Sequence, residues 1–304
     1  MSKPKSNNAK TISVALTLCL VCSVLVSAVA VGLKPAQVEN ARLDRNKNIL
    51  VAADMYNAES DTPEDVAERF KDFEVEIIDL NKGTYLDDNA LVDVGIPDRN
   101  DYDASQATKN AALSEDLGEN DPAGIGRKPK YAKVYLKKDD AGKPELVVLP
   151  IQGYGLWGTI YGFLTLESDM NTIKGISFYE HKETPGLGAR IEEPEWRAKW
   201  TGIHSYDEEG NVATGVTKAG TPKENWVDGI SGATLTGRGV SNMIQFWLGD
   251  QGYKPYLDAL RKESGQTVEN SDAKAAQSTK PATQTAQPNT ELAAKLPAAN
   301  GKEA

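Results

Sequence analysis

Residues 228–236 form a short loop whose residue types suit the attachment of a phosphate-bearing group. The loop reads Asp-Gly-Ile-Ser-Gly-Ala-Thr-Leu-Thr and leads into a pattern typical of a helix. The three residues before Thr234 are small, so a large group could reach the Thr234 hydroxyl. Amides at the start of a helix attract negative charge, so a phosphate beside Thr234 or Thr236 would be well placed. A Ser or Thr helix cap with a glycine turn explains the same residues equally well, and both interpretations stay open.

Two charged residues flank this loop. Asp228 could accept the proton of the Thr234 hydroxyl, or hold a metal ion during attachment, and we treat both roles as hypotheses. Arg238 could pair with a phosphate, but we interpret it as a solvated residue of the following helix.

Two further glycine-rich stretches could contribute to a binding site. Residues 153–158 (Gly-Tyr-Gly-Leu-Trp-Gly) match G-x-G-x-x-G, but a strand pattern follows instead of the helix that a dinucleotide motif requires. We therefore predict a hairpin turn with Trp157 in the core, and a flat surface for an aromatic cofactor is the alternative. Residues 180–188 (Glu-His-Lys-Glu-Thr-Pro-Gly-Leu-Gly) predict a turn with accessible backbone amides. Glu183 and Thr184 are candidate ligand contacts there, while an ordinary tight turn is the alternative.

Hydrophobic periodicity predicts the elements that position these loops. Strands are expected over 73–80, 131–137, 145–151, 159–166 and 172–180. Helices are expected over 193–200, from a start near 236–239 to Gly249, and over 253–260. The strands come mostly consecutively and the helices afterwards. This order favours an α+β fold with a mixed, largely antiparallel sheet flanked by helices.

Residues 12–33 carry no charge and are long enough to cross a bilayer as a helix. Three lysines and no acidic residue precede this stretch, so the positive-inside rule keeps the N-terminus in the cytoplasm and exports the rest. A cleaved signal peptide is the alternative, because Ala-Val-Ala at 28–30 imitates a cleavage site. The length of the apolar run favours an uncleaved anchor.

These features divide the chain into five parts. A cytoplasmic N-terminus (1–11) and a transmembrane helix (12–33) precede an exported N-terminal part (34–130) that includes an irregular acidic arm over 87–130. One domain (131–262) holds the glycine-rich loops. The tail (263–304) is rich in Ala, Gln, Thr and Pro, and we expect it to be disordered because it offers little apolar area to bury.

Composition excludes several classes of function. The formal charge of -10 argues against a nucleic-acid partner, which needs a basic face. The two cysteines, Cys19 and Cys22, both lie in the apolar stretch, and the two histidines are His181 and His204. We therefore predict no metal site and no disulfide framework.

The loop 228–234 resembles the flavinylation sequence of FMN-binding domains. Four further runs in the expected order widen the resemblance, which covers roughly residues 8–262, to the NqrC family of the Na⁺-translocating NADH:quinone oxidoreductases. These runs are 43–50 (Leu-Asp-Arg-Asn-Lys-Asn-Ile-Leu), 155–157 (Gly-Leu-Trp), 183–188 (Glu-Thr-Pro-Gly-Leu-Gly) and 246–250 (Phe-Trp-Leu-Gly-Asp).

The resemblance implies that residues 131–262 form an FMN-binding domain. A flavin transferase would link FMN through its phosphate to Thr234, giving a phosphodiester, and Thr236 would hydrogen-bond the phosphate. The implied cofactor-binding residues come from three segments: Asp228, Ser231, Gly232, Ala233, Thr234 and Thr236; Leu156 and Trp157; and Glu183, Thr184 and Leu187.

The resemblance further implies an electron carrier with no catalytic residues of its own. The carrier would belong to a bacterial inner-membrane complex that moves electrons from NADH to quinone and couples this to Na⁺ export. Its partners would be subunits A, B, D, E and F and the lipid bilayer, with the FMN domain in the periplasm. The alternatives are the corresponding FMN subunit of a ferredoxin:NAD⁺ oxidoreductase complex and a non-redox membrane-anchored scaffold protein.

Overall fold

The structure, a computed structural model, describes residues 8–264. The expected tail lies outside these residues from position 265 onward, as do residues 1–7 of the N-terminus. The helices are α1 (Asn8–Ala52), α2 (Pro63–Arg69), α3 (Asp88–Asp93), α4 (Ala104–Ala107), α5 (Pro194–Arg197), α6 (Thr234–Leu248) and α7 (Lys254–Glu263). The strands are β1 (Phe73–Asp79), β2 (Thr84–Tyr85), β3 (Ser114–Asp116), β4 (Arg127–Pro129), β5 (Tyr131–Lys138), β6 (Pro144–Tyr154), β7 (Thr159–Glu167) and β8 (Ile173–Glu180).

The apolar segment of α1 continues without a break into the soluble domain. Among the described residues, α1 is the helix that is long and apolar enough to cross a membrane. Pro35 lies inside it, where the missing N–H removes one hydrogen bond without ending the helix. Only the last turns are buried, at Ile49, Leu50 and Ala52. One helix therefore joins the predicted membrane anchor directly to the core.

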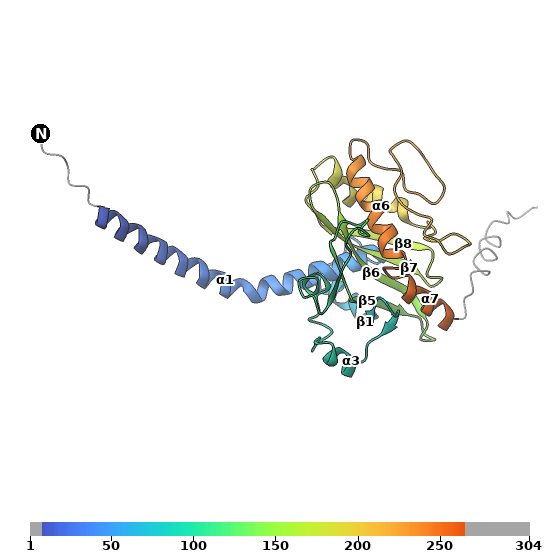
Figure 1. The fold of residues 1–304 in the computed structure, drawn as a ribbon, viewed down its shortest axis with the longest axis horizontal. Helices are drawn as coiled ribbons and strands as arrows, with labels where there is room; N and C mark the ends of the chain where they lie inside the picture. The colour runs from blue at the N-terminus through green and yellow to red at the C-terminus, as the bar shows by residue number, and fades with distance from the viewer. Residues whose placement is uncertain (1–7, 265–304) are drawn as a thin grey trace, which may run out of the picture. The chain divides into compact units, whose positions relative to one another are not determined.

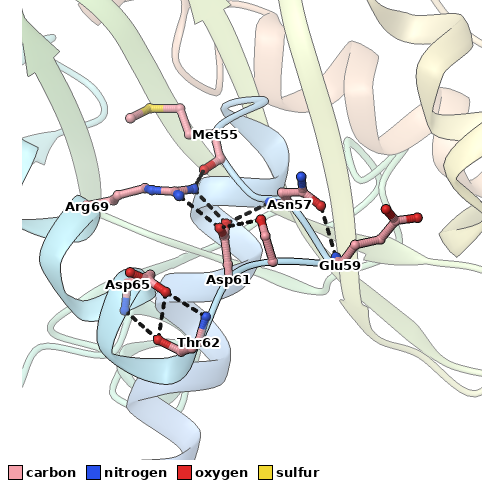
Figure 2. Close-up of polar contacts among 8 residues, drawn as sticks. Met55, Asn57, Glu59, Asp61, Thr62, Asp65 and Arg69 are labelled. Carbon is pink, nitrogen blue, oxygen red and sulfur yellow. Dashed lines mark hydrogen bonds and ion pairs between the residues drawn. The ribbon is translucent and has the colours of Figure 1, made fainter.

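A polar network fixes the turn between α1 and α2 (Figure 2). Arg69 donates to the Met55 carbonyl at 2.8 Å and forms a bidentate salt bridge with the Asp61 carboxylate at 2.6 and 2.8 Å. Thr62 caps α2 with a reciprocal bond to Asp65, in the capping-box arrangement. Because Arg69 holds both the end of α1 and the start of α2, the chain leaves α1 in a defined direction.

The central sheet has six strands in the order β2-β1-β5-β6-β7-β8, and each of its neighbouring pairs is antiparallel. The one parallel pairing among the described residues is an isolated bridge between Val216 and Val227. The five strands expected from the sequence are present within a few residues. The prediction of an α+β domain with a largely antiparallel sheet is confirmed.

Each face of the sheet is covered by different helices (Figure 1). On β7, Phe163 packs with Ile49 and Leu50 of α1, while the next residue, Leu164, packs in the cluster that contains α6 and α7. This alternation follows from the two-residue period of a strand. The larger core lies under α6, which contributes Met243 and other side chains to it.

The region 87–130 is more ordered than the sequence indicated. It contains α3, α4 and the two-stranded sheet β3–β4, and Leu91 and Tyr102 are buried there. Asp87 and Asp103 cap the two short helices with their carboxylates. The expectation of an irregular arm is therefore wrong, because local capping and a small apolar cluster order a stretch that has little hydrophobic periodicity.

Candidate functional site

The turn between β6 and β7 is the first part of the site. Tyr154 pairs with Thr159 across the hairpin, and Gly155 N–H donates to the Gly158 carbonyl at 2.8 Å. The hairpin prediction is confirmed, and no helix follows the glycines. Trp157, however, is 61% exposed, so its expected place in the core is wrong. Its indole N–H donates to the Thr184 hydroxyl at 3.1 Å, which holds the ring at the surface.

The loop after β8 makes the second part. Leu187 N–H donates to the Thr184 carbonyl at 3.1 Å, with Pro185 and Gly186 between them. Gly186 has φ of +74°, as the third position of a type II turn requires. The turn brings the exposed side chain of Leu187 toward the third loop, where a Cβ on Gly232 would stand 3.1 Å from Leu187 Cδ2.

The third part is the start of α6. Gly232 has φ of +79°, and Ala233 N–H donates to the Ile230 carbonyl at 3.0 Å. Helix α6 begins at Thr234, two to five residues earlier than expected, with Ala233 at the N-cap and no side-chain cap. The alternative of a Ser or Thr cap is therefore wrong. Thr234 is exposed on a first turn whose backbone donors lack a side-chain partner.

Glu183 joins the three parts through one buried carboxylate. Its side chain is 5% exposed. Oε1 accepts the backbone N–H groups of Leu156 and Trp157 at 2.9 and 3.1 Å, and Oε2 accepts the Thr236 hydroxyl at 2.5 Å. Bonds to a carboxylate are stronger than neutral ones, so Glu183 fixes the hairpin turn against the first turn of α6.

Thr236 and Asp228 have different partners from those expected. The Thr236 hydroxyl is buried and bonded to Glu183, so it faces away from the surface on which Thr234 lies. The Asp228 carboxylate accepts Gly220 N–H at 2.8 Å, and its carbonyl accepts the Trp196 indole N–H at 3.1 Å. Asp228 thus ties the loop to its neighbours, and no bond to Thr234 is found in the described part of the chain.

The other charged residues near the site do not converge on Thr234. Arg238 is exposed on α6, as expected. His181 accepts the Glu183 N–H at Nδ1, and its Nε2 lies 2.8 Å from the Glu192 carboxylate. Residues 8–264 contain no group of three or more His, Cys, Asp or Glu that could hold a metal ion.

Large apolar side chains are exposed on all three parts of the site. Five of them are exposed: Tyr154, Leu156, Trp157, Leu187 and Leu235. We call these five residues the apolar patch. Sequence reasoning missed Tyr154 and Leu235. Leu235 could have been found because the apolar spacing of α6 begins only at Val240, so an apolar residue before it does not belong to the buried face. Exposed apolar surface on neighbouring loops is typical of a binding site.

Gly239 allows α6 to pack directly on the hairpin turn. A Cβ at this position would stand 2.4 Å from the Tyr154 carbonyl oxygen and 3.0 Å from Gly155 Cα. Both are backbone atoms, so neither can rotate away. The absence of a side chain at Gly239 is therefore a condition for packing α6 on the turn that carries Trp157.

Gly239→Ala is expected to destabilise the domain by about 1–3 kcal/mol, although alanine normally favours a helix over glycine. The added methyl group pushes α6 away from the hairpin. The thermal midpoint of the full chain in detergent measures this effect. Gly32→Ala in α1 is the matched control, because nothing lies within 4 Å of its Cβ position. Equal midpoints for the two variants would contradict this packing.

Comparison with known proteins agrees with this arrangement of loops. Residues 155–249 match the family described as FMN-binding domain. This range begins at the hairpin turn and ends just after α6, so it encloses all three parts of the site.

Curated relatives match over most of the chain. The C subunit of the Na⁺-translocating NADH-quinone reductase from Pseudomonas aeruginosa is 40% identical over 264 residues, covering 85% of this chain and 98% of the relative. The protein of the same name from Vibrio parahaemolyticus is 42% identical, covering 84% of this chain and 97% of the relative.

Solved structures share the fold. The crystal structure of Shewanella oneidensis NqrC has a TM-score of 0.63 at 34% identity, covering 73% of this chain and 99% of that one. The structure of the same reductase component from Parabacteroides distasonis has a TM-score of 0.56 at 26% identity, covering 74% of this chain and 96% of that one. The chain therefore belongs to the NqrC family, a component of the Na⁺-translocating NADH-quinone reductases, which are membrane oxidoreductase complexes.

Proposed function

We propose that this chain carries FMN joined through its phosphate to Thr234, and that it relays electrons within a Na⁺-translocating NADH–quinone reductase. One observation supports this most directly: Thr234 is exposed on the first turn of α6, which has no side-chain cap, beside the apolar patch. The phosphate would bind at the uncapped first turn of α6, and the flat aromatic ring would pack on the apolar patch beside it.

The residues present fit both ends of the cofactor. The backbone donors at the start of α6 suit a phosphate, and no acidic residue lies in that first turn to repel it. Leu156, Trp157 and Leu187 would hold the ring system, while Ser231, Gly232 and Ala233 leave room for the linkage. Glu183 and Thr184 would support the ring site indirectly, because their hydrogen bonds position Trp157.

Attachment would use the Thr234 hydroxyl as the nucleophile. Its oxygen would form a bond to the phosphorus of an activated flavin nucleotide supplied with a flavin transferase. The anhydride bond to the leaving phosphate would break, and the hydroxyl proton would pass to solvent. When bound, FMN supplies redox chemistry that amino acid side chains lack. The protein retains the cofactor and sets its surroundings.

We further propose that α1 crosses the bacterial inner membrane once, with the N-terminus in the cytoplasm and the FMN-binding domain in the periplasm. The lysines before the apolar stretch support this orientation. Subunits A, B, D, E and F would be the partners, and the complex would couple electron transfer to Na⁺ export. The glycine run 153–158 forms a hairpin turn, so we place NADH oxidation on another component of the complex.

Flavin fluorescence of the denatured protein on a gel tests the attachment. The full chain is expressed with and without a flavin transferase, and the gel is viewed under ultraviolet light before staining. A fluorescent band that requires the transferase is expected. A dark band in both lanes, with the protein folded and the transferase active on another substrate, would contradict covalent attachment.

A further inference from the structure

The central sheet opens between β5 and β6. Their pairing ends at Tyr135 and Val148, although both strands continue beyond these residues. Pro150 has no N–H to offer β5. Its carbonyl accepts the Tyr253 hydroxyl at 2.7 Å, and the Gln152 carbonyl accepts the Trp247 indole N–H at 2.7 Å. Side chains from the α6–α7 region therefore replace the missing strand partner.

A cavity of about 150 Å³ lies at this opening. Aromatic side chains make up a large part of its wall, among them Tyr135, Tyr161, Phe163, Tyr179 and Trp247. Arg45 of α1 and Lys133 of β5 line it as well. We call it the β5–β6 cavity. Flat apolar walls with two nearby cations are suited to a ring that carries a negative charge.

The two cations lack an ion-pair partner within residues 8–264. Lys133 is buried and donates to the Asn100 carbonyl at 2.8 Å, with no carboxylate oxygen within 4 Å. Arg45 is half-buried and has neither a hydrogen bond nor an ion pair in the described chain. Burial, and then the like charge of Arg45, lower the pKa of Lys133 to about 8. Lys133 is therefore still mostly charged at pH 7, although unpaired buried charge is costly.

Two other polar groups of the lining bear on what the cavity can bind. Tyr135 is only 4% exposed, and its hydroxyl has no hydrogen-bond partner among the described residues. Burial raises the pKa of Tyr135 to about 12, so the hydroxyl stays a neutral donor. Asp103 also lines the cavity, but its Oδ1 is engaged by the amides of Ser105 and Gln106. The charged groups that line the cavity are thus two cations and one carboxylate, while Asp101 and Asp98 act on Lys133 from outside the lining and raise its pKa.

We propose that the β5–β6 cavity binds a small aromatic monocarboxylate. The carboxylate pairs with Arg45 and Lys133 and accepts the Tyr135 hydroxyl, and the ring packs between the aromatic side chains. One negative charge balances the excess of one cation over carboxylate among the lining residues. A dianion such as phosphate would exceed that balance and would leave the aromatic walls uncovered.

Calorimetric titration of the full chain in detergent micelles tests this site with three probes. Benzoate has the ring and the charge, benzamide has the ring without the charge, and acetate has the charge without the ring. Benzoate is expected to bind at least tenfold more tightly than either of the others. Equal affinity for benzamide and benzoate, or no binding of benzoate up to about 10 mM, would overturn the proposal.

Two variants locate the binding. Arg45→Gln and Lys133→Met are each expected to weaken benzoate binding about tenfold or more, the effect of losing one charge-assisted contact. Lys137→Gln is the matched control on the same strand, because Lys137 pairs with Glu145 and does not line the cavity. The thermal midpoint of each variant shows whether it is folded. If Lys133→Met does not fold, the result for Arg45→Gln decides the outcome. Unchanged affinity in Arg45→Gln would overturn the site.

Discussion

Thr234→Val is expected to abolish covalent flavin while the protein still folds. Valine keeps the branched shape of threonine but has no hydroxyl to bond to phosphorus. Because Thr234 is exposed at the first position of α6, the free energy of unfolding should change by only about 0.5 kcal/mol. In the assembled complex, NADH-driven quinone reduction and Na⁺ uptake into inverted vesicles should both fall to background.

Thr201→Val is the matched control for this prediction. Thr201 is also an exposed threonine, at the end of the short helical segment after α5. This variant should retain full flavin fluorescence and full quinone reduction. Fluorescence that persists in Thr234→Val would place the attachment elsewhere. Thr236 is a poor substitute, since its hydroxyl is buried and bonded to Glu183.

Glu183 substitutions are expected to have the second largest effect. Glu183→Ala leaves the Thr236 hydroxyl and the N–H groups of Leu156 and Trp157 without their acceptor. The cost in unfolding free energy should be about 2–4 kcal/mol, because buried donors lose bonds to a charged group. Denaturant titration of the full chain in detergent measures this loss.

Glu183→Gln separates positioning from charge. Glutamine can still accept the two backbone N–H groups, and its amide can donate to a rotated Thr236 hydroxyl, so the fold should persist. Removing a buried negative charge near the flavin should raise its midpoint potential by tens of millivolts, on the order expected from Coulomb interaction at a partly buried site. Glu180→Gln, on the exposed end of β8, is the control. An unchanged potential in Glu183→Gln would contradict an electrostatic role for Glu183.

The strands and the long helices could be predicted from the sequence because their signals are local. Residues 145–151 and 159–166 alternate or run apolar within one strand length, and glycines mark the turn between them. The spacing of Val240, Met243 and Ile244 likewise predicts α6 without knowledge of what it packs on. The charge-free run 12–33 predicts the anchor by length alone.

The contacts inside the site could not be predicted in the same way. The Glu183 carboxylate reaches Leu156 and Thr236, which lie 27 and 53 residues away in the chain. No periodicity connects positions that far apart. Residue type alone places Trp157 in the core, because tryptophan is usually buried, but its hydrogen bond to Thr184 holds it at the surface. The predicted start of α6 is too late, because the apolar spacing begins only at Val240, whereas the helix begins at Thr234 with an exposed first turn.

Mass spectrometry of the purified chain tests the central claim most directly. Trypsin should release residues 224–238, which contain Ser231, Thr234 and Thr236. The proposed phosphodiester predicts that this peptide carries the mass of FMN less one water, and fragmentation should place the added mass on Thr234. An unmodified peptide from protein made with an active flavin transferase, or the added mass on any other residue, would contradict the proposal.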